Sequence, residues 1–205
     1  MNHMRNTMKR LIGVLAVVIL AVGFAGAQGV AIGVKGLYFT PAEQSFKDIY
    51  GSGPAYGLEA NFGLTKNLDL WIGADYYQKK GELTFSKMET DVRILPVTAG
   101  LRYRIPAGPV RFYAGAGLGY FLFREENLIG KVDVRKLGFL GKAGAYVRVF
   151  QGLYIDAHLR YSYCVIKPQD IKANIGGLSF GVGFGYDFGL GDVAPIPQWR
   201  EVIEK

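Results

Sequence analysis

The sequence contains a single cysteine, Cys164, and only two histidines, His3 and His158. One cysteine excludes an internal disulfide framework and any zinc cluster built from cysteines. A metal site with two histidines would have to recruit the extreme N-terminus of the chain. We therefore expect neither a metal nor any other cofactor.

Long hydrophobic runs are absent after the N-terminus, where no stretch reaches 18 consecutive apolar residues. The N-terminal run from Leu11 to Phe24 follows a basic segment and precedes the small-residue pattern Ala25-Gly26-Ala27. This arrangement predicts a cleaved secretory signal peptide over residues 1–27. An uncleaved anchor is the alternative, but the run is shorter than the roughly 20 residues that a spanning helix needs. A mature chain in a membrane would therefore not cross it as helices.

The excess of positive over negative charge is also modest. The 205 residues carry a formal net charge of +7, and the predicted signal peptide takes three basic and no acidic residues with it, which leaves +4. This balance does not favour nucleic acid as a partner, and an export signal argues against it. The length of 205 residues fits one large all-β domain or two small ones. The 29 glycines follow no Gly-X-Y period, which excludes collagen.

The mature chain shows alternation with a period of two. Residues 110–123 place Phe112 and Leu118 on one face, and Arg111 and several glycines on the other. Alternation over this length predicts a β-strand, because a helix would not sort residues in this way. We also expect a bulge at Pro96, which has no N–H to donate to a ladder. The eight predicted strands span residues 29–39, 55–64, 68–79, 92–105, 110–123, 136–150, 153–165 and 177–188.

The connections between these strands alternate between long and short. The three short ones, at 65–67, 106–109 and 151–152, contain turn residues. A meander with all short turns at one end and all long loops at the other is typical of a transmembrane β-barrel. The four long connections are polar and charged, and we expect them to be loops: 41–54, 80–91, 124–135 and 166–175.

Three features indicate that the apolar face meets lipid and the polar face lines a lumen. The predicted strands are long enough to cross a bilayer at a tilt, which takes roughly 9–11 residues. Glycine is concentrated on the polar face, which suits a narrow interior. Aromatic residues gather near strand ends on the apolar face, as interfacial girdles require: Tyr56, Tyr76, Tyr103, Tyr161, Tyr163, Tyr186 and Phe188.

Two segments rich in glycine and aromatic residues, Tyr113–Tyr120 and Ser179–Phe188, combine with the predicted signal peptide. Together they resemble the outer-membrane β-barrel domain family, the small barrels of the OmpA transmembrane-domain, OmpX and opacity-protein type. The resemblance covers roughly residues 28–188 and implies an all-β, eight-stranded antiparallel up-and-down transmembrane β-barrel in the outer membrane. It also implies insertion by the outer-membrane assembly machinery, with short turns in the periplasm and long loops outside.

Barrels of this family often stop at a terminal aromatic residue that the assembly machinery reads. Tyr186 and Phe188 match that assembly signal, yet 17 residues follow them. We expect residues 189–205 to be a short periplasmic tail, either a disordered end or a short amphipathic helix at the base of the barrel.

Charges of both signs fall on inward positions, which predicts a network of ion pairs across the lumen, because a lone buried charge would be costly. An eight-stranded interior is barely wide enough for side chains to fill. We interpret the network as a plug that holds the barrel closed; the alternative is an ion-selective path or gate. The predicted network consists of Lys35, Glu59, Asp75, Arg102, Lys142, Asp156, Arg160 and Asp187.

Catalytic residues are not evident, so we do not expect an enzyme. His158 and Ser162 face inward but lie about 13 Å apart along a strand, too far for a nucleophile and its base. Pairing of the last two strands would place Ser162 opposite Ser179 and His158 opposite Gly183. The Gly-x-Gly-x-Gly runs are not nucleotide loops, because no helix follows them.

The sequence therefore favours a non-enzymatic barrel with a structural or surface-interaction role through long extracellular loops. The loop charges are mixed in sign and suit contact with lipopolysaccharide or with an external receptor or ligand, in addition to membrane lipids. We expect a monomer. The alternative is a narrow channel for small or hydrophobic solutes.

Overall fold

The computed structural model describes residues 29–82, 88–128, 130–167 and 172–189. The predicted signal peptide at 1–27 lies outside these residues, as does the predicted tail at 189–205 apart from Gly189. Across the part that is described, no helix is long and apolar enough to span a membrane.

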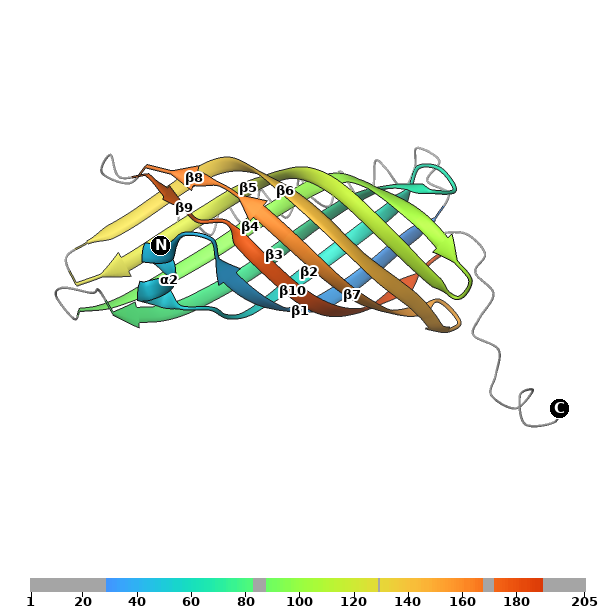
Figure 1. Cartoon of the computed structure of the whole chain (residues 1–205), viewed down its shortest axis with the longest axis horizontal. Coiled ribbons are helices and arrows are strands. Elements are labelled where there is room, and N and C mark those ends of the chain that lie inside the picture. Colours follow the sequence, from blue (N-terminus) through green and yellow to red (C-terminus); the bar gives the residue numbers. More distant parts are fainter. Residues whose placement is uncertain (1–28, 83–87, 129, 168–171, 190–205) are drawn as a thin grey trace, which may run out of the picture.

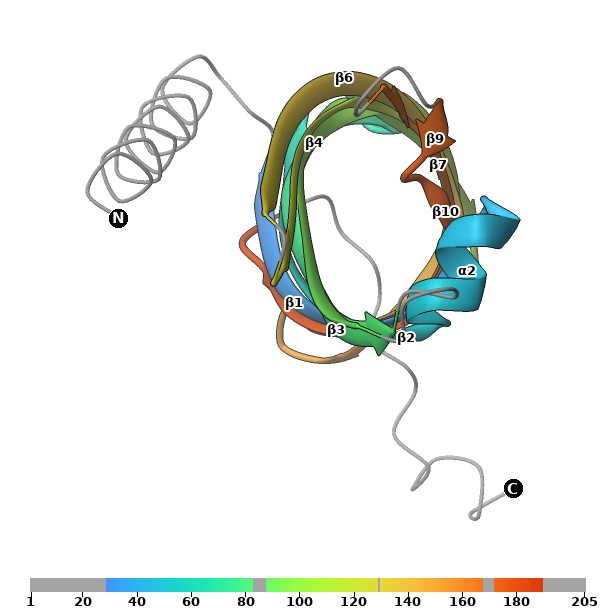
Figure 2. The same cartoon turned by 90° about the vertical axis from the view of Figure 1, so that its left-hand side faces the viewer.

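Eight antiparallel strands close into a barrel, as the sequence predicts (Figure 1). They are β1 (Val30–Pro41), β2 (Gly53–Gly63), β3 (Leu68–Glu82), β4 (Glu89–Ala107), β5 (Val110–Asn127), β6 (Lys131–Phe150), β7 (Leu153–Tyr163) and β10 (Gly177–Asp187). Their order around the barrel is β1-β10-β7-β6-β5-β4-β3-β2, so β1 pairs with both β2 and β10. Viewed from one end, the strands form a ring (Figure 2).

The predicted sorting of residues between the two faces is confirmed. On β10, Phe180 and Phe184 are 58% and 55% exposed on the outer surface, whereas Ser179 and Asp187 are buried inside. The same alternation holds on β5, where Phe112 is exposed and its neighbours are buried. The outer surface is therefore apolar, as a membrane-facing surface must be.

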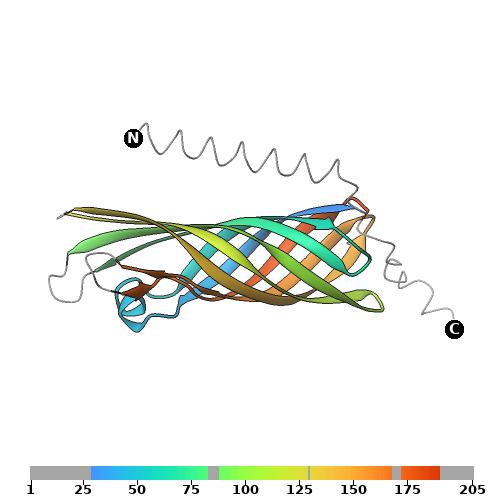
Figure 3. The same cartoon turned by 90° about the horizontal axis from the view of Figure 1, so that it is seen from above.

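Two of the predicted long loops are wrong. Residues 80–91 and 124–135 belong mostly to strands, because β3 and β4 pair up to Glu82 and Glu89, and β5 and β6 pair up to Glu126 and Lys131. These hairpins extend beyond the rest of the barrel (Figure 3).

The physical reason for these extensions is that the alternation continues with its polarity inverted. Val92 and Phe123 point inward and are buried, while their neighbours Arg93 and Arg124 lie on the outer surface. Outside a membrane, water solvates the outward charges and the apolar residues turn to the interior. A charged stretch can therefore remain a strand, because its charged side chains point to water and its apolar side chains point to the interior.

The other two long connections contain short elements. The connection between β1 and β2 contains the helix α2 (Gln44–Tyr50), which lies at the rim of the barrel (Figure 2). The connection between β7 and β10 contains a small hairpin of β8 (Val165–Ile166) and β9 (Ala173–Asn174). Both lie at the same end as the extended hairpins, so short turns and long connections are segregated as predicted (Figure 1).

The bulge predicted at Pro96 is also wrong. The β4–β5 register passes through Pro96 without a shift. On the other side, Ala74 pairs with Val97 and Tyr77 pairs with Ile94, which is a single register interrupted near the proline. The missing N–H therefore leaves a local gap in the ladder of hydrogen bonds, but the strand contains no extra residue.

The predicted pairing of the last two strands is out by two residues. Ser179 lies opposite Arg160, and His158 lies opposite Gly181. The small hairpin follows the same register, because Val165 pairs with Asn174 rather than with a later residue. A slip of two keeps every side chain on its predicted face.

Candidate functional site

The lumen is the candidate site, and its polar layer is centred on Glu59 of β2. The Glu59 carboxylate lies 2.7 Å from the Lys35 Nζ of β1 and 2.6 Å from the Lys142 Nζ of β6. Arg102 of β4 approaches the same carboxylate at 3.8 Å. All four side chains are buried, so three cations from three strands converge on one acid across the lumen.

A second carboxylate extends this layer toward the short turns. Asp69 is fully buried and pairs with Arg102 at 2.8 Å and with Arg104 at 3.0 Å. Arg104 Nη2 also donates to the carbonyl oxygens of Thr65 and Lys66 in the β2–β3 turn. The sequence-based network omitted Asp69 and Arg104, although both share the inward face of residues that it included.

A third carboxylate, Asp156 of β7, joins the layer from the other side. It lies 2.9 Å from His158 Nδ1 and 3.7 Å from the Lys35 ammonium, and it accepts a hydrogen bond from the Tyr113 hydroxyl at 2.8 Å. Ser162 instead exchanges hydrogen bonds with the backbone of Gly177. His158 and Ser162 therefore have different partners, and the histidine contacts the charge network through Asp156.

The remaining predicted charges form two separate pairs. Arg160 pairs with Asp75, and Asp187 pairs with Arg148, which the sequence-based network omitted. All eight predicted residues thus face inward, but the structure divides them among a central group and two flanking pairs.

Aromatic side chains pack against the cations of the central group. The Lys142 Nζ lies 4.1 Å from the centre of the Trp71 ring, and the Arg102 guanidinium lies 4.9 Å from that of Tyr113. Such contacts compensate part of the lost hydration of a buried cation. In the polar layer, cations are therefore held between carboxylates and aromatic rings.

An apolar layer fills the lumen on the α2 side of the charges. The rings of Phe39 and Tyr77 meet edge to face with centres 4.9 Å apart. Two buried inward side chains of β5, Phe121 and Phe123, belong to the same cluster. The cluster also includes Leu37, Val92, Ile94, Cys164, Ile166 and Ile175.

The helix α2 covers this apolar layer. Phe46 and Tyr50 are buried, and the Phe46 ring lies 6.3 Å from that of Phe123. The Tyr50 hydroxyl donates a hydrogen bond of 2.7 Å to Glu125 and lies 3.1 Å from the Thr90 hydroxyl. Burial raises the pKa of Tyr50, and the neighbouring Glu125 carboxylate acts in the same direction. The phenol therefore stays protonated and remains a donor that fixes the helix.

A cavity of about 30 Å³ marks the junction of the two layers. Phe39 and Phe121 border it on the apolar side, and Asp75, Arg160 and Ser162 on the polar side. This volume corresponds to about one water molecule. Within the described residues, no group of three or more histidine, cysteine or acidic side chains is placed to hold a metal ion.

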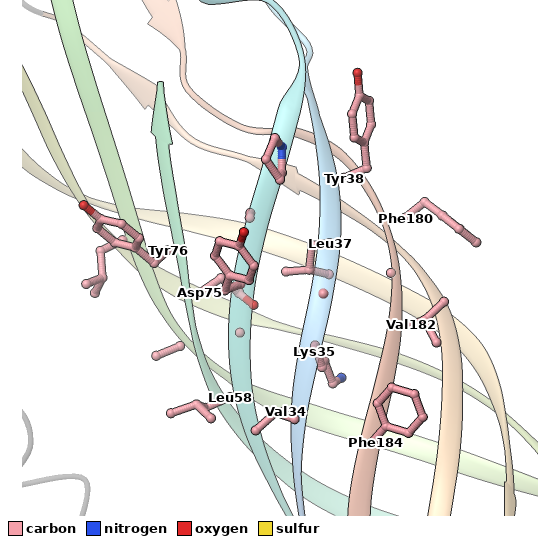
Figure 4. Close-up of a pocket in the computed structure, with 18 residues that line it drawn as sticks. Val34, Lys35, Leu37, Tyr38, Leu58, Asp75, Tyr76, Phe180, Val182 and Phe184 are labelled. Carbon is pink, nitrogen blue, oxygen red and sulfur yellow. The ribbon is translucent and has the colours of Figure 1, made fainter. Parts of the chain in front are cut away.

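A larger hollow of about 950 Å³ lies on the outer surface over β1, β2, β3 and β10 (Figure 4). Gly36 is one of its lining residues, and a side chain there would meet only one backbone atom, at 4.0 Å. The labelled side chains of Tyr38, Phe180 and Phe184 stand around it. The hollow is apolar and belongs to the membrane-facing surface, not to a path through the lumen.

A closed antiparallel barrel with an apolar outer surface and charges inside defines a transmembrane β-barrel. A family model described as the outer membrane protein beta-barrel domain matches residues 12–188. The chain belongs to this family and is an outer-membrane protein.

Solved structures share the fold. Neisserial surface protein A is 21% identical, with a TM-score of 0.60 over 80% of this chain and 99% of that one. The outer membrane protein OprG from Pseudomonas aeruginosa is 16% identical, with a TM-score of 0.64 over 79% and 96%. The N-terminal β-barrel domain of Pseudomonas aeruginosa OprF is 18% identical, with a TM-score of 0.53 over 80% and 99%. No curated protein sequence matches the chain.

Proposed function

We propose that the protein is a non-enzymatic barrel with a structural or surface-interaction role, whose lumen is closed to solutes. One observation carries this proposal: a polar layer around Glu59 and an apolar layer around Phe121 fill the interior in series. Ions would have to cross the apolar layer unsolvated, whereas apolar solutes would have to displace paired charges.

The surface role rests on the end that carries α2. The β3–β4 and β5–β6 hairpins extend past the helix, so the described residues of the regions predicted as loops project mostly as paired strands (Figure 3). We propose that this end faces outside and contacts lipopolysaccharide or an external receptor or ligand. In this orientation the short turns lie in the periplasm.

Export and assembly complete the proposal. The signal peptide at 1–27 is removed, and the assembly machinery recognises Tyr186 and Phe188. Both rings lie on the outer surface at the end of β10, with centres 4.7 Å apart, where a partner can reach them. The barrel works as a monomer with a short periplasmic tail.

The alternative function is a narrow channel for small or hydrophobic solutes, and planar-bilayer recording tests the choice. We expect protein purified from outer membranes, and shown to be folded by a heat-dependent gel shift, to give no single-channel steps. Reproducible ion-selective steps would contradict the proposal and favour the channel.

The variant Lys142→Ala sharpens this test. It removes a cation buried beside Glu59, so under the proposal it should lower the denaturant midpoint of unfolding while the bilayer stays silent. A change in ion selectivity at unchanged stability would instead indicate that Lys142 lines a conducting path.

A further inference from the structure

The cavity of about 30 Å³ lies where the polar layer of the lumen meets the apolar layer. Its apolar wall includes Phe39 of β1, Tyr77 of β3 and Phe121 of β5, which all belong to the apolar cluster. A cavity of this size can hold a water molecule if its walls are polar, whereas a purely apolar cavity stays dry. The polar wall consists of four side chains from β3, β7 and β10: Asp75, Arg160, Ser162 and Ser179.

The ion pair between Asp75 and Arg160 crosses the lumen beside this cavity. Its two strands, β3 and β7, lie on opposite sides of the ring. A buried ion pair is stable only when further hydrogen bonds satisfy its remaining donors and acceptors. Arg160 donates to Asp75 through Nη1, while its Nε has no hydrogen-bond partner in the described part of the chain. The carboxylate accepts through Oδ2 and has further acceptor sites, so the pair brings unused donors and acceptors to the cavity.

Two serine hydroxyls complete the polar wall. Ser162 Oγ donates to the carbonyl oxygen of Gly177 and accepts from the Gly177 N–H, so one of its two lone pairs is left. Ser179 is 2% exposed, and its hydroxyl makes no hydrogen bond with any described residue. A buried hydroxyl without a partner is costly, and ordered water satisfies such groups where no protein group reaches them.

The four side chains together match the hydrogen bonds of one water molecule, which can donate two and accept two. Arg160 and Ser179 can donate to it, whereas Asp75 and Ser162 can accept from it. The acid and the base of the wall already pair with each other. A neutral occupant therefore fits this cavity better than an ion, which would need a further counter-charge.

The cavity also lies beside the gap in the β3–β4 ladder. Pro96 borders it and has no N–H to donate. Asp75 and Tyr76 have no partner in the β3–β4 register, although the pairs on both sides of them do. A contact from Asp75 across the lumen therefore holds β3 at a point where its own ladder is interrupted.

We propose that this cavity binds a single water molecule, which links Asp75 of β3 to Arg160 and Ser162 of β7 and to Ser179 of β10. The water completes the hydrogen bonds of the ion pair on the side of the apolar layer. It also ties β3 to the opposite wall of the lumen. The site goes beyond the proposed function, because one water molecule held in this way neither opens nor closes the lumen.

Nuclear magnetic resonance of the folded protein, with ¹⁵N-labelled arginine in deuterated detergent, tests this site with water itself as the probe. We expect the Nε–H of Arg160 to show a cross-peak at the water frequency that changes sign between nuclear and rotating-frame Overhauser spectra. That reversal identifies bound water, since proton exchange gives the same sign in both. Arg102 is the internal control and should show no such cross-peak, because its Nε donates to Asp69 at 2.8 Å.

Two substitutions at Ser179 separate its hydroxyl from the volume of the cavity. Ser179→Ala removes one polar partner and leaves three, which suffice for a bound water, so the cross-peak should persist. Ser179→Val places methyl groups in the cavity, so the cross-peak should disappear. Thr98→Val is the matched control, since it removes another buried hydroxyl of the lumen, which donates to the carbonyl oxygen of Gly73, and it should change nothing.

Loss of the cross-peak in both Ser179 variants would overturn the proposal, since the signal would then come from the serine hydroxyl. Persistence in both would place the water outside the cavity and would overturn it too. So would a wild type without the cross-peak, or one with an equal cross-peak at Arg102, where the whole lumen would be hydrated. The heat-dependent gel shift monitors folding. If Ser179→Val does not fold, Ala55→Val fills the cavity from its apolar wall and should give the same loss.

Discussion

Replacement of Glu59 by glutamine is expected to destabilise the barrel by about 3–5 kcal/mol, the cost of removing one partner from a buried ion pair. The substitution keeps the shape of the side chain but leaves Lys35, Lys142 and Arg102 converging on a neutral amide. These cations lie inside the barrel, where water cannot replace the lost carboxylate.

The measurement is the free energy of unfolding from denaturant titration in lipid vesicles. Fluorescence of Trp71, which touches Lys142, reports the lumen directly in a Trp199→Phe background. The matched control is Glu126→Gln, an exposed carboxylate on the same barrel, with an expected effect within about 0.5 kcal/mol. The double variant Glu59→Gln/Lys142→Met should recover at least about 1 kcal/mol, because it removes one of the stranded cations. Wild-type stability of Glu59→Gln would show that the network does not hold the barrel closed.

The strands, and the face on which each residue lies, could be predicted because the alternation with a period of two holds both in the membrane and in water. Phe180 and Phe184 alternate with glycine on β10 whatever the register, so a slip of two left the predicted faces intact. The ends of the strands could not be predicted in the same way. Beyond the membrane, Arg93 and Arg124 point outward and Val92 inward, and a local excess of charge resembles a loop.

The sequence predicts which charged residues lie in the lumen, but not which of them form ion pairs. Parity alone places Lys35, Glu59 and Lys142 inside. Their meeting depends on how β2 and β6, which are not neighbours in the sheet, face each other across the closed barrel. That distance follows from the tilt and stagger of all eight strands, which no local pattern contains. The omission of Asp69 has no such reason, because it shares the inward face of Asp75 and lies opposite Arg102 on the neighbouring strand.

Replacement of Gly117 by valine is expected to prevent closure of the barrel. Gly117 lies opposite Gly100 on the inner face, and a Cβ atom there would lie 2.3 Å from the carbonyl oxygen of Ala99 and 2.8 Å from the Gly100 Cα. Both obstacles are backbone, so relief requires β4 and β5 to separate. The same close approach makes room for Trp71, whose ring would lie 2.7 Å from a Cβ atom on Gly100.

The expected loss exceeds the roughly 1–3 kcal/mol of an ordinary overpacked side chain, because no rotamer change relieves it. Gly117→Val should therefore fail to show the heat-dependent gel shift after refolding. Gly141→Val is the matched control, since Gly141 lies on the adjacent strand, opposite Ala116, but faces outward. Its nearest atom would be the Gly115 oxygen at 3.8 Å, which is ordinary contact, and the added methyl groups would meet lipid. A normal gel shift for both variants would contradict the close β4–β5 approach, and loss of the shift in both would mean that valine, not its place in the lumen, is the cause.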